Sequence, residues 1–195
     1  MAKLLRNLAA TLLFGVLLLV VVAYGFHSDV LRNSVYAQTM LHFLQLLALI
    51  LWIGLLLAFN FIVQPGRPMG VFEGIADEML ADALIWSRYA ALFAILTTLL
   101  PAFLAGNAGD VLLLRGEARV AGFGLWLMVI MAANLWLFIW PLQKRALGLI
   151  EAESDIRSNA AIVATIFSRI NLMLVLPMLY CLVTADLGSR LQQLP

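Results

Sequence analysis

Residues 39–63, TMLHFLQLLALILWIGLLLAFNFIV, decide the fold. The run contains no Asp, Glu, Lys or Arg. A helix needs about 20 mostly apolar residues to cross the roughly 30 Å hydrocarbon core of a bilayer. Lipid offers no hydrogen-bond partners, so the backbone of such a segment must bond to itself, as it does in a helix. Residues 39–63 therefore predict a transmembrane helix.

Four further apolar runs have the same character. Apolar residues make up 64% of the 195-residue chain, whereas soluble domains are near half apolar. The length of the runs and their lack of strict alternation exclude membrane β-strands. The sequence therefore predicts an all-α integral membrane bundle, one transmembrane domain over residues 1–195. Its five helices are expected at about residues 8–26, 39–63, 83–105, 120–140 and 160–184.

Basic residues are distributed unevenly between the connections, which predicts the orientation. With the N-terminus in the cytoplasm, eight of the 12 Lys and Arg residues lie on the inner side and four on the outer side. The C-terminus is then outside. The inner residues are Lys3, Arg6, Arg67, Arg88, Lys144, Arg145, Arg157 and Arg169, and the outer ones are Arg32, Arg115, Arg119 and Arg190.

Composition excludes several classes of function. The net charge is +1, so no global field favours nucleic acid. Cys181 is the single cysteine, which leaves no disulfide framework and suits a small packing residue. No Asp or Glu lies in the middle of a span, which argues against an ion-coupled transporter. No Ser-His-Asp set is present inside the membrane, which argues against hydrolysis.

The two histidines, His27 and His42, are expected in an outer layer, at the facing ends of the first two helices. Two imidazoles are the axial ligands that a six-coordinate haem b needs. Met178 and Cys181, in the outer half of the fifth helix, are further possible ligands. The alternative is that His27 lies exposed at the membrane surface and that His42 is hydrogen-bonded inside the bundle. No metal other than haem iron at His42 is expected.

A second group of polar residues is expected in an inner layer. His42 and Asn60 lie 18 residues apart, five turns at 3.6 residues per turn, so they share a face that we expect to look into the bundle. Arginines and amides at one depth suit an anion. Alternatively, Arg88 and Arg169 reach lipid phosphate, and tryptophans such as Trp86, Trp136 and Trp140 form an interfacial belt. The predicted anion or substrate pocket consists of Asn60, Arg88, Asn134, Trp140, Arg169 and Asn171.

Several blocks, in order and with compatible gaps over about residues 40–185, resemble the membrane domain of bacterial urate oxidases (urate hydroxylases). In that family, this domain accompanies a cytochrome c domain. The resemblance implies a four-helix core at about 40–185 plus an N-terminal helix, and it favours the inner layer and His42 as functional positions. The blocks are Leu41-His42 with Trp52-Ile53-Gly54 and Phe59-Asn60, Trp86-Ser87-Arg88-Tyr89, Asn134-Leu135-Trp136, Ile139-Trp140-Pro141-Leu142-Gln143-Lys144, Ser168-Arg169-Ile170-Asn171 and Leu176-Pro177-Met178-Leu179.

The chain also departs from the family pattern. It contains no Cys-x-x-Cys-His, so an enzyme oxidising urate would need a separate electron acceptor. Leu142 stands where the family has Asn, and Ile170 stands where a threonine is expected. Both changes remove polarity from the proposed pocket, so catalysis by the isolated chain is not expected.

We therefore expect a subunit of a larger cytochrome- or oxidase-type redox complex in the bacterial inner membrane, holding haem b at His42. Its expected partners are the bilayer, other membrane subunits and a cytochrome c. One alternative is a urate-type purine oxidase that works with a separate cytochrome c, in which Arg88 and Arg169 clamp the ring. The other is a purely structural subunit. Small residues would then permit close helix contacts, namely Gly54, Gly106, Gly122 and Gly124.

Overall fold

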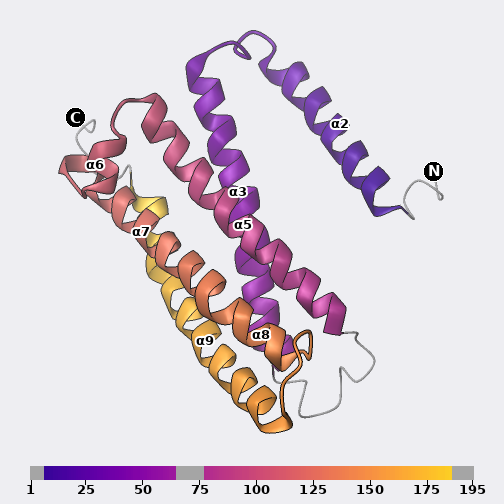
Figure 1. The fold of residues 1–195 in the computed structure, drawn as a ribbon. Coiled ribbons are helices and arrows are strands. Elements are labelled where there is room, and N and C mark those ends of the chain that lie inside the picture. The colour runs from indigo at the N-terminus through magenta and orange to yellow at the C-terminus, as the bar shows by residue number, and fades with distance from the viewer. Residues whose placement is uncertain (1–6, 65–76, 186–195) are drawn as a thin grey trace. The chain divides into compact units, whose positions relative to one another are not determined.

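The computed structural model describes residues 7–64 and 77–185. The chain divides into two compact units, residues 1–40 and 41–195. The first unit contains α2 (Leu8–His27), whose first turn is capped by the Asn7 side chain accepting from the Ala10 N–H, and the start of α3 (Ser34–Ala58). The second unit contains the rest of α3 and the elements that follow it (Figure 1). These are η1 (Phe59–Val63), α5 (Asp77–Leu104), α6 (Ala108–Leu112), η3 (Gly116–Ala118), α7 (Arg119–Asn134), η4 (Leu135–Ile139), α8 (Trp140–Ala146) and α9 (Ser154–Thr184).

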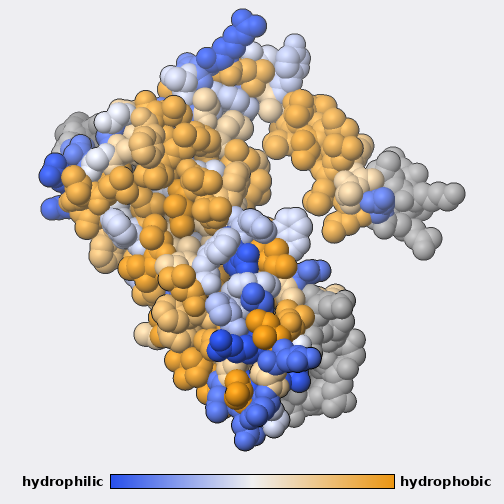
Figure 2. Space-filling model, viewed as in Figure 1, coloured by the Kyte–Doolittle hydropathy of each residue, from blue (hydrophilic) through white to orange (hydrophobic). Residues whose placement is uncertain are grey.

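Five helical stretches are long and apolar enough to cross a bilayer, which confirms the predicted fold class. The protein is a multi-pass integral membrane protein. In the second unit, apolar residues cover most of the face shown in Figure 2, and polar residues gather at the end where α8 and the first turns of α9 lie. The stretches are Leu8–His27, Ser34–Val63, Met79–Leu104, Gly116–Ala146 and Ser154–Thr184.

Three helices begin five or six residues before their predicted starts. The second, third and fifth were expected from about residues 39, 83 and 160, whereas α3, α5 and α9 begin at Ser34, Asp77 and Ser154. Apolarity marks only the part of a helix that lies in hydrocarbon. The hydrogen-bonding ladder continues into polar turns beyond it, so hydropathy alone shortens the helices.

Helices α7 and α9 run antiparallel and side by side (Figure 1). Two of the four predicted contact glycines explain close packing of α7. A Cβ on Gly122 would collide with the Val111 carbonyl oxygen of α6, and one on Gly124 would lie 3.1 Å from the Cys181 Cβ of α9. Gly54 and Gly106 make no such contact within the described chain, since a Cβ on either meets nothing within 4 Å. Gly106 instead adopts a left-handed turn with φ of 74°, a conformation natural to glycine.

One stripe of α3 and η1 faces the core of the second unit. Its buried residues follow the helical period to Asn60, the last of them along the chain. His42 shares this stripe, but its side chain is exposed. His42 and Asn60 therefore lie on one face of this helical stretch, at opposite ends of the buried stripe. The buried residues are Gln45, Ala48, Leu49, Trp52, Leu56 and Asn60.

Candidate functional site

His42 is oriented by a chain of hydrogen bonds between α3 and α5. Its Nδ1 lies 3.3 Å from Gln45 Oε1, an acceptor, so Nδ1 carries the proton and Nε2 is left with a free lone pair. Gln45 Nε2 donates to Thr98 Oγ1 at 2.7 Å, and Thr98 donates to the Ala94 carbonyl at 2.7 Å. Gln45 is buried while the His42 ring is exposed. The chain therefore holds the imidazole by one nitrogen and presents the other outward.

His27 belongs to the first unit, where it is the last residue of α2. Its exposed ring packs against Tyr36 with centroids 5.6 Å apart. It lines a hollow of about 300 Å³ together with Tyr36, Thr39 and Met40. Its environment therefore differs from that of His42, because no polar side chain orients the His27 ring.

The two further candidate ligands in α9 are buried. Met178 is fully buried, and the thiol Cys181 packs near Gly124 of α7. Cys181 therefore lies at the contact between α7 and α9, and Met178 belongs to the hydrophobic core. Over residues 7–64 and 77–185, no three His, Cys, Asp or Glu side chains cluster as a metal site.

Asn134 and Asn171 join α7 to α9 reciprocally. Asn134 Nδ2 donates to the Phe167 carbonyl of α9 at 3.0 Å and to Asn171 Oδ1 at 2.7 Å. Asn171 Nδ2 donates to the Met131 carbonyl of α7 at 3.0 Å. Each amide therefore bonds to the backbone of the other helix. We call these four residues the asparagine clasp.

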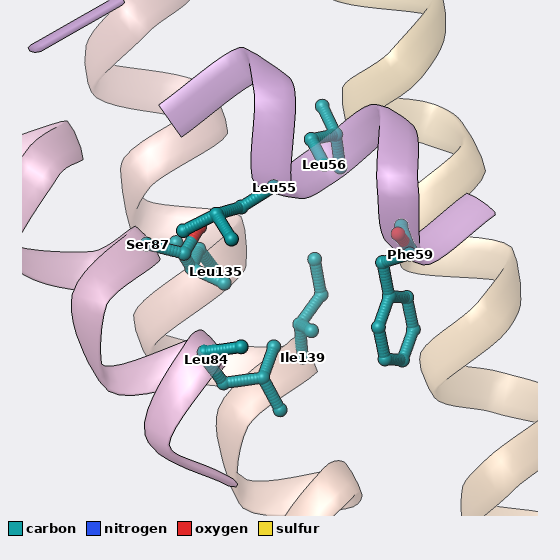
Figure 3. A pocket seen from close by; sticks show the side chains of 9 residues that line it. Leu55, Leu56, Phe59, Leu84, Ser87, Leu135 and Ile139 are labelled. Carbon is teal, nitrogen blue, oxygen red and sulfur yellow. The ribbon is translucent and has the colours of Figure 1, made fainter. Parts of the chain in front are cut away.

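Asn60 bonds to a serine that sequence analysis missed as a site residue. Asn60 Nδ2 donates to Ser168 Oγ of α9 at 2.8 Å and to the Leu56 carbonyl at 2.9 Å, while the buried Oδ1 has no partner. Beside Ser168 lies a cavity of about 30 Å³, also lined by Ser87 of α5 (Figure 3). That volume suits a single water molecule. A serine is too common in helices for its sequence position to reveal this contact.

Arg88 of α5 is stacked between two tryptophans. Its Cζ lies 4.2 Å from the ring centroid of Trp136 and 4.5 Å from that of Trp140. Lys144 approaches the same Trp140 ring, with its Nζ 5.2 Å from the centroid. The buried Arg88 Nε has no hydrogen-bond partner. Arg88 and Trp140 were predicted site residues and Lys144 was not, although its spacing of four residues from Trp140 places both on one helix face.

Arg169 is not brought into these interactions. Its side chain is exposed on α9, whereas Ser168 and Asn171 on the same helix are buried. Successive residues of a helix point about 100° apart, so Arg169 lies on a different face from either neighbour. The structure thus connects Asn60 with Ser168, Asn134 with Asn171 and Arg88 with Trp140, and it places Arg169 apart from all three pairs.

Two π-helical segments lie at these polar positions. Asn60 is the second residue of η1, and η4 follows directly after Asn134 and contains Trp136. Such segments are rare and frequently occur at functional sites. Helix α9 contacts both of them. The π-helical turns and the unpartnered buried atoms therefore make this end of the second unit a candidate functional site.

No protein-family model, curated protein or solved structure matches this chain.

Proposed function

We propose that this chain is a membrane subunit of a larger redox complex and that His42 is an axial ligand of haem b. The hydrogen bond from His42 Nδ1 to Gln45 carries the proposal. Metal-bound histidines typically donate their second ring nitrogen to a fixed acceptor, which sets the tautomer and the ring orientation. Here Gln45 is itself held by Thr98. The arrangement leaves Nε2 available to iron on an exposed part of α3.

The residues around His42 fit one axial ligand of a haem. A haem b in this position would accept and release single electrons for the complex. Gln45 and Thr98 would hold the ring in place. A second ligand to the iron would come from a partner subunit. The exposed apolar helices would contact lipid and neighbouring subunits, and the excess of basic residues in the inner connections supports a cytoplasmic N-terminus in a bacterial inner membrane.

Haem spectroscopy of the intact protein tests this proposal. The full chain is purified in mild detergent with its associated subunits, and reduced-minus-oxidised spectra are recorded. We expect b-type bands in the wild type and their loss in His42→Ala. His27→Ala, which removes the other histidine of the chain, is the matched control and should keep the bands. Absence of haem bands from a folded, partner-bound wild-type sample would reject the proposal.

One observation favours the structural alternative. In the asparagine clasp, the amide donors of Asn134 and Asn171 are occupied by other protein groups, as in polar pairs that join transmembrane helices. A subunit with neither cofactor nor substrate would copurify with a stable complex without adding any spectral feature. The urate-type oxidase alternative requires Arg88 and Arg169 to meet one ligand. Urate loss in membranes that contain the wild type or Arg169→Ala separates that alternative.

A further inference from the structure

Arg88 and Lys144 lie against tryptophan rings and have no anionic partner among the described residues. The Trp140 ring contacts both cations, and the Trp136 ring contacts Arg88 as well. Within the part of the chain that the structure describes, neither cation makes a hydrogen bond or an ion pair. An indole face attracts a cation but accepts few of its N–H bonds. The guanidinium donors therefore remain available for a ligand.

The tryptophans also fix the position of the guanidinium. Contacts of 4.2 and 4.5 Å to two rings hold its centre, so little conformational freedom remains to be lost on binding. A planar guanidinium donates two parallel hydrogen bonds to a phosphate, and an ammonium adds a point charge. Both cations lie against the same Trp140 ring, so a phosphate that reached both would offset their mutual repulsion. The arrangement therefore favours a phosphate group.

The position of the pair along the helices agrees with this ligand. Lys144 lies in the last turn of α8, close to the end of the Gly116–Ala146 span. Polar residues gather at this end of the second unit (Figure 2). Tryptophans concentrate where bilayer headgroups begin, and basic pockets between transmembrane helices bind lipid headgroups.

We propose that Arg88, Lys144 and the two tryptophans form a binding site for a phosphate group, carried by a phospholipid headgroup or by a soluble phosphate. Arg88 donates hydrogen bonds to the phosphate oxygens, Lys144 supplies the second charge, and Trp136 and Trp140 hold the cations in place. This site is separate from His42 and does not depend on haem.

Native mass spectrometry of the purified full chain tests the site. The probes are dioleoyl phosphatidylglycerol, dioleoylglycerol, which lacks the phosphate, and inorganic phosphate. We expect Arg88→Gln and Lys144→Gln each to weaken phosphatidylglycerol binding by about tenfold or more, the effect of losing one charge-assisted contact. The matched control is Arg145→Gln, which removes one charge from the exposed neighbour of Lys144 and should change affinity less than about twofold.

The probes also identify the source of the phosphate. Phosphatidylglycerol binding that excess inorganic phosphate does not displace assigns the site to a lipid. Displacement by inorganic phosphate assigns it to a soluble phosphate. Equal binding of dioleoylglycerol and phosphatidylglycerol, or equal affinity in Lys144→Gln and Arg145→Gln, overturns the proposal. Because Arg88→Gln could fail to fold, the comparison of Lys144→Gln with Arg145→Gln decides the outcome independently.

Discussion

Replacing Asn171 with leucine tests how strongly the asparagine clasp joins α7 to α9. The change keeps the approximate size of a side chain that is 1% exposed. It removes two hydrogen bonds, the one from Asn134 Nδ2 and the one to the Met131 carbonyl. Hydrogen bonds between transmembrane helices contribute about 0.6 kcal/mol on average and up to about 1.7 kcal/mol. Asn171→Leu should therefore lower the free energy of unfolding by about 1 to 3 kcal/mol.

The assay is reversible unfolding of the purified protein in mixed detergent micelles with increasing sodium dodecyl sulfate, followed by circular dichroism. Asn134→Leu and the double variant complete a mutant cycle. Both single variants lose the bond between the two amides, so the double variant should cost less than their sum by about 0.6 to 1.7 kcal/mol. Thr184→Val, which removes a hydroxyl bonded within α9 itself, is the control. Additive effects within about 0.5 kcal/mol would refute the clasp.

Three further changes test other parts of the structure. Gly122→Ala should destabilise the protein by about 1 to 3 kcal/mol, because the new Cβ meets a backbone carbonyl of α6. Gly54→Ala places its Cβ in open space and should stabilise the protein slightly. Equal unfolding midpoints for the two variants would contradict this packing. Gln45→Leu should lower haem affinity about 10- to 100-fold, as loss of a ligand-orienting residue does, measured by haem titration; unchanged affinity would remove Gln45 from the His42 site. Arg169→Ala should change the free energy of unfolding by less than about 0.5 kcal/mol, since the side chain is exposed, and a large drop in micelle unfolding assays would show that α9 packs differently.

Hydropathy predicted the five spans because the need to bury backbone polar groups in lipid leaves helices as the only solution for such runs. The face on which Asn60 lies was also predictable, since the 3.6-residue period places it with the core residues of α3. The basic residues Lys3, Arg6, Arg67 and Arg190, on which the predicted orientation partly depends, lie outside the described residues.

The side-chain partners could not be predicted from the sequence. The residue number gives the depth of a side chain along its helix. Which neighbouring helix that side chain meets becomes known only when the packing of the helices is known. Arg169 was therefore grouped with Asn171 by depth, although about 200° of helical rotation separates them. Gln45, Ser168 and Lys144 are ordinary residue types whose importance comes entirely from Thr98, Asn60 and Trp140, contributed by other helices or by another turn.

The π-helical segment η4 changes the register of everything that follows it. A π turn accommodates one residue more than an α turn over nearly the same rise, so each residue beyond η4 is rotated by about 100° relative to a continuous α-helix. Trp140, Lys144 and Gln143 therefore occupy faces that a straight extension of α7 would give to their neighbours. Deleting one residue of η4, such as the exposed Leu137, would restore an α-helical ladder and leave Trp140 on the face that meets Arg88, because the π turn accommodates that residue as an extra one. The π turn, as much as the composition of this helix, thus determines which side chains meet at its polar end.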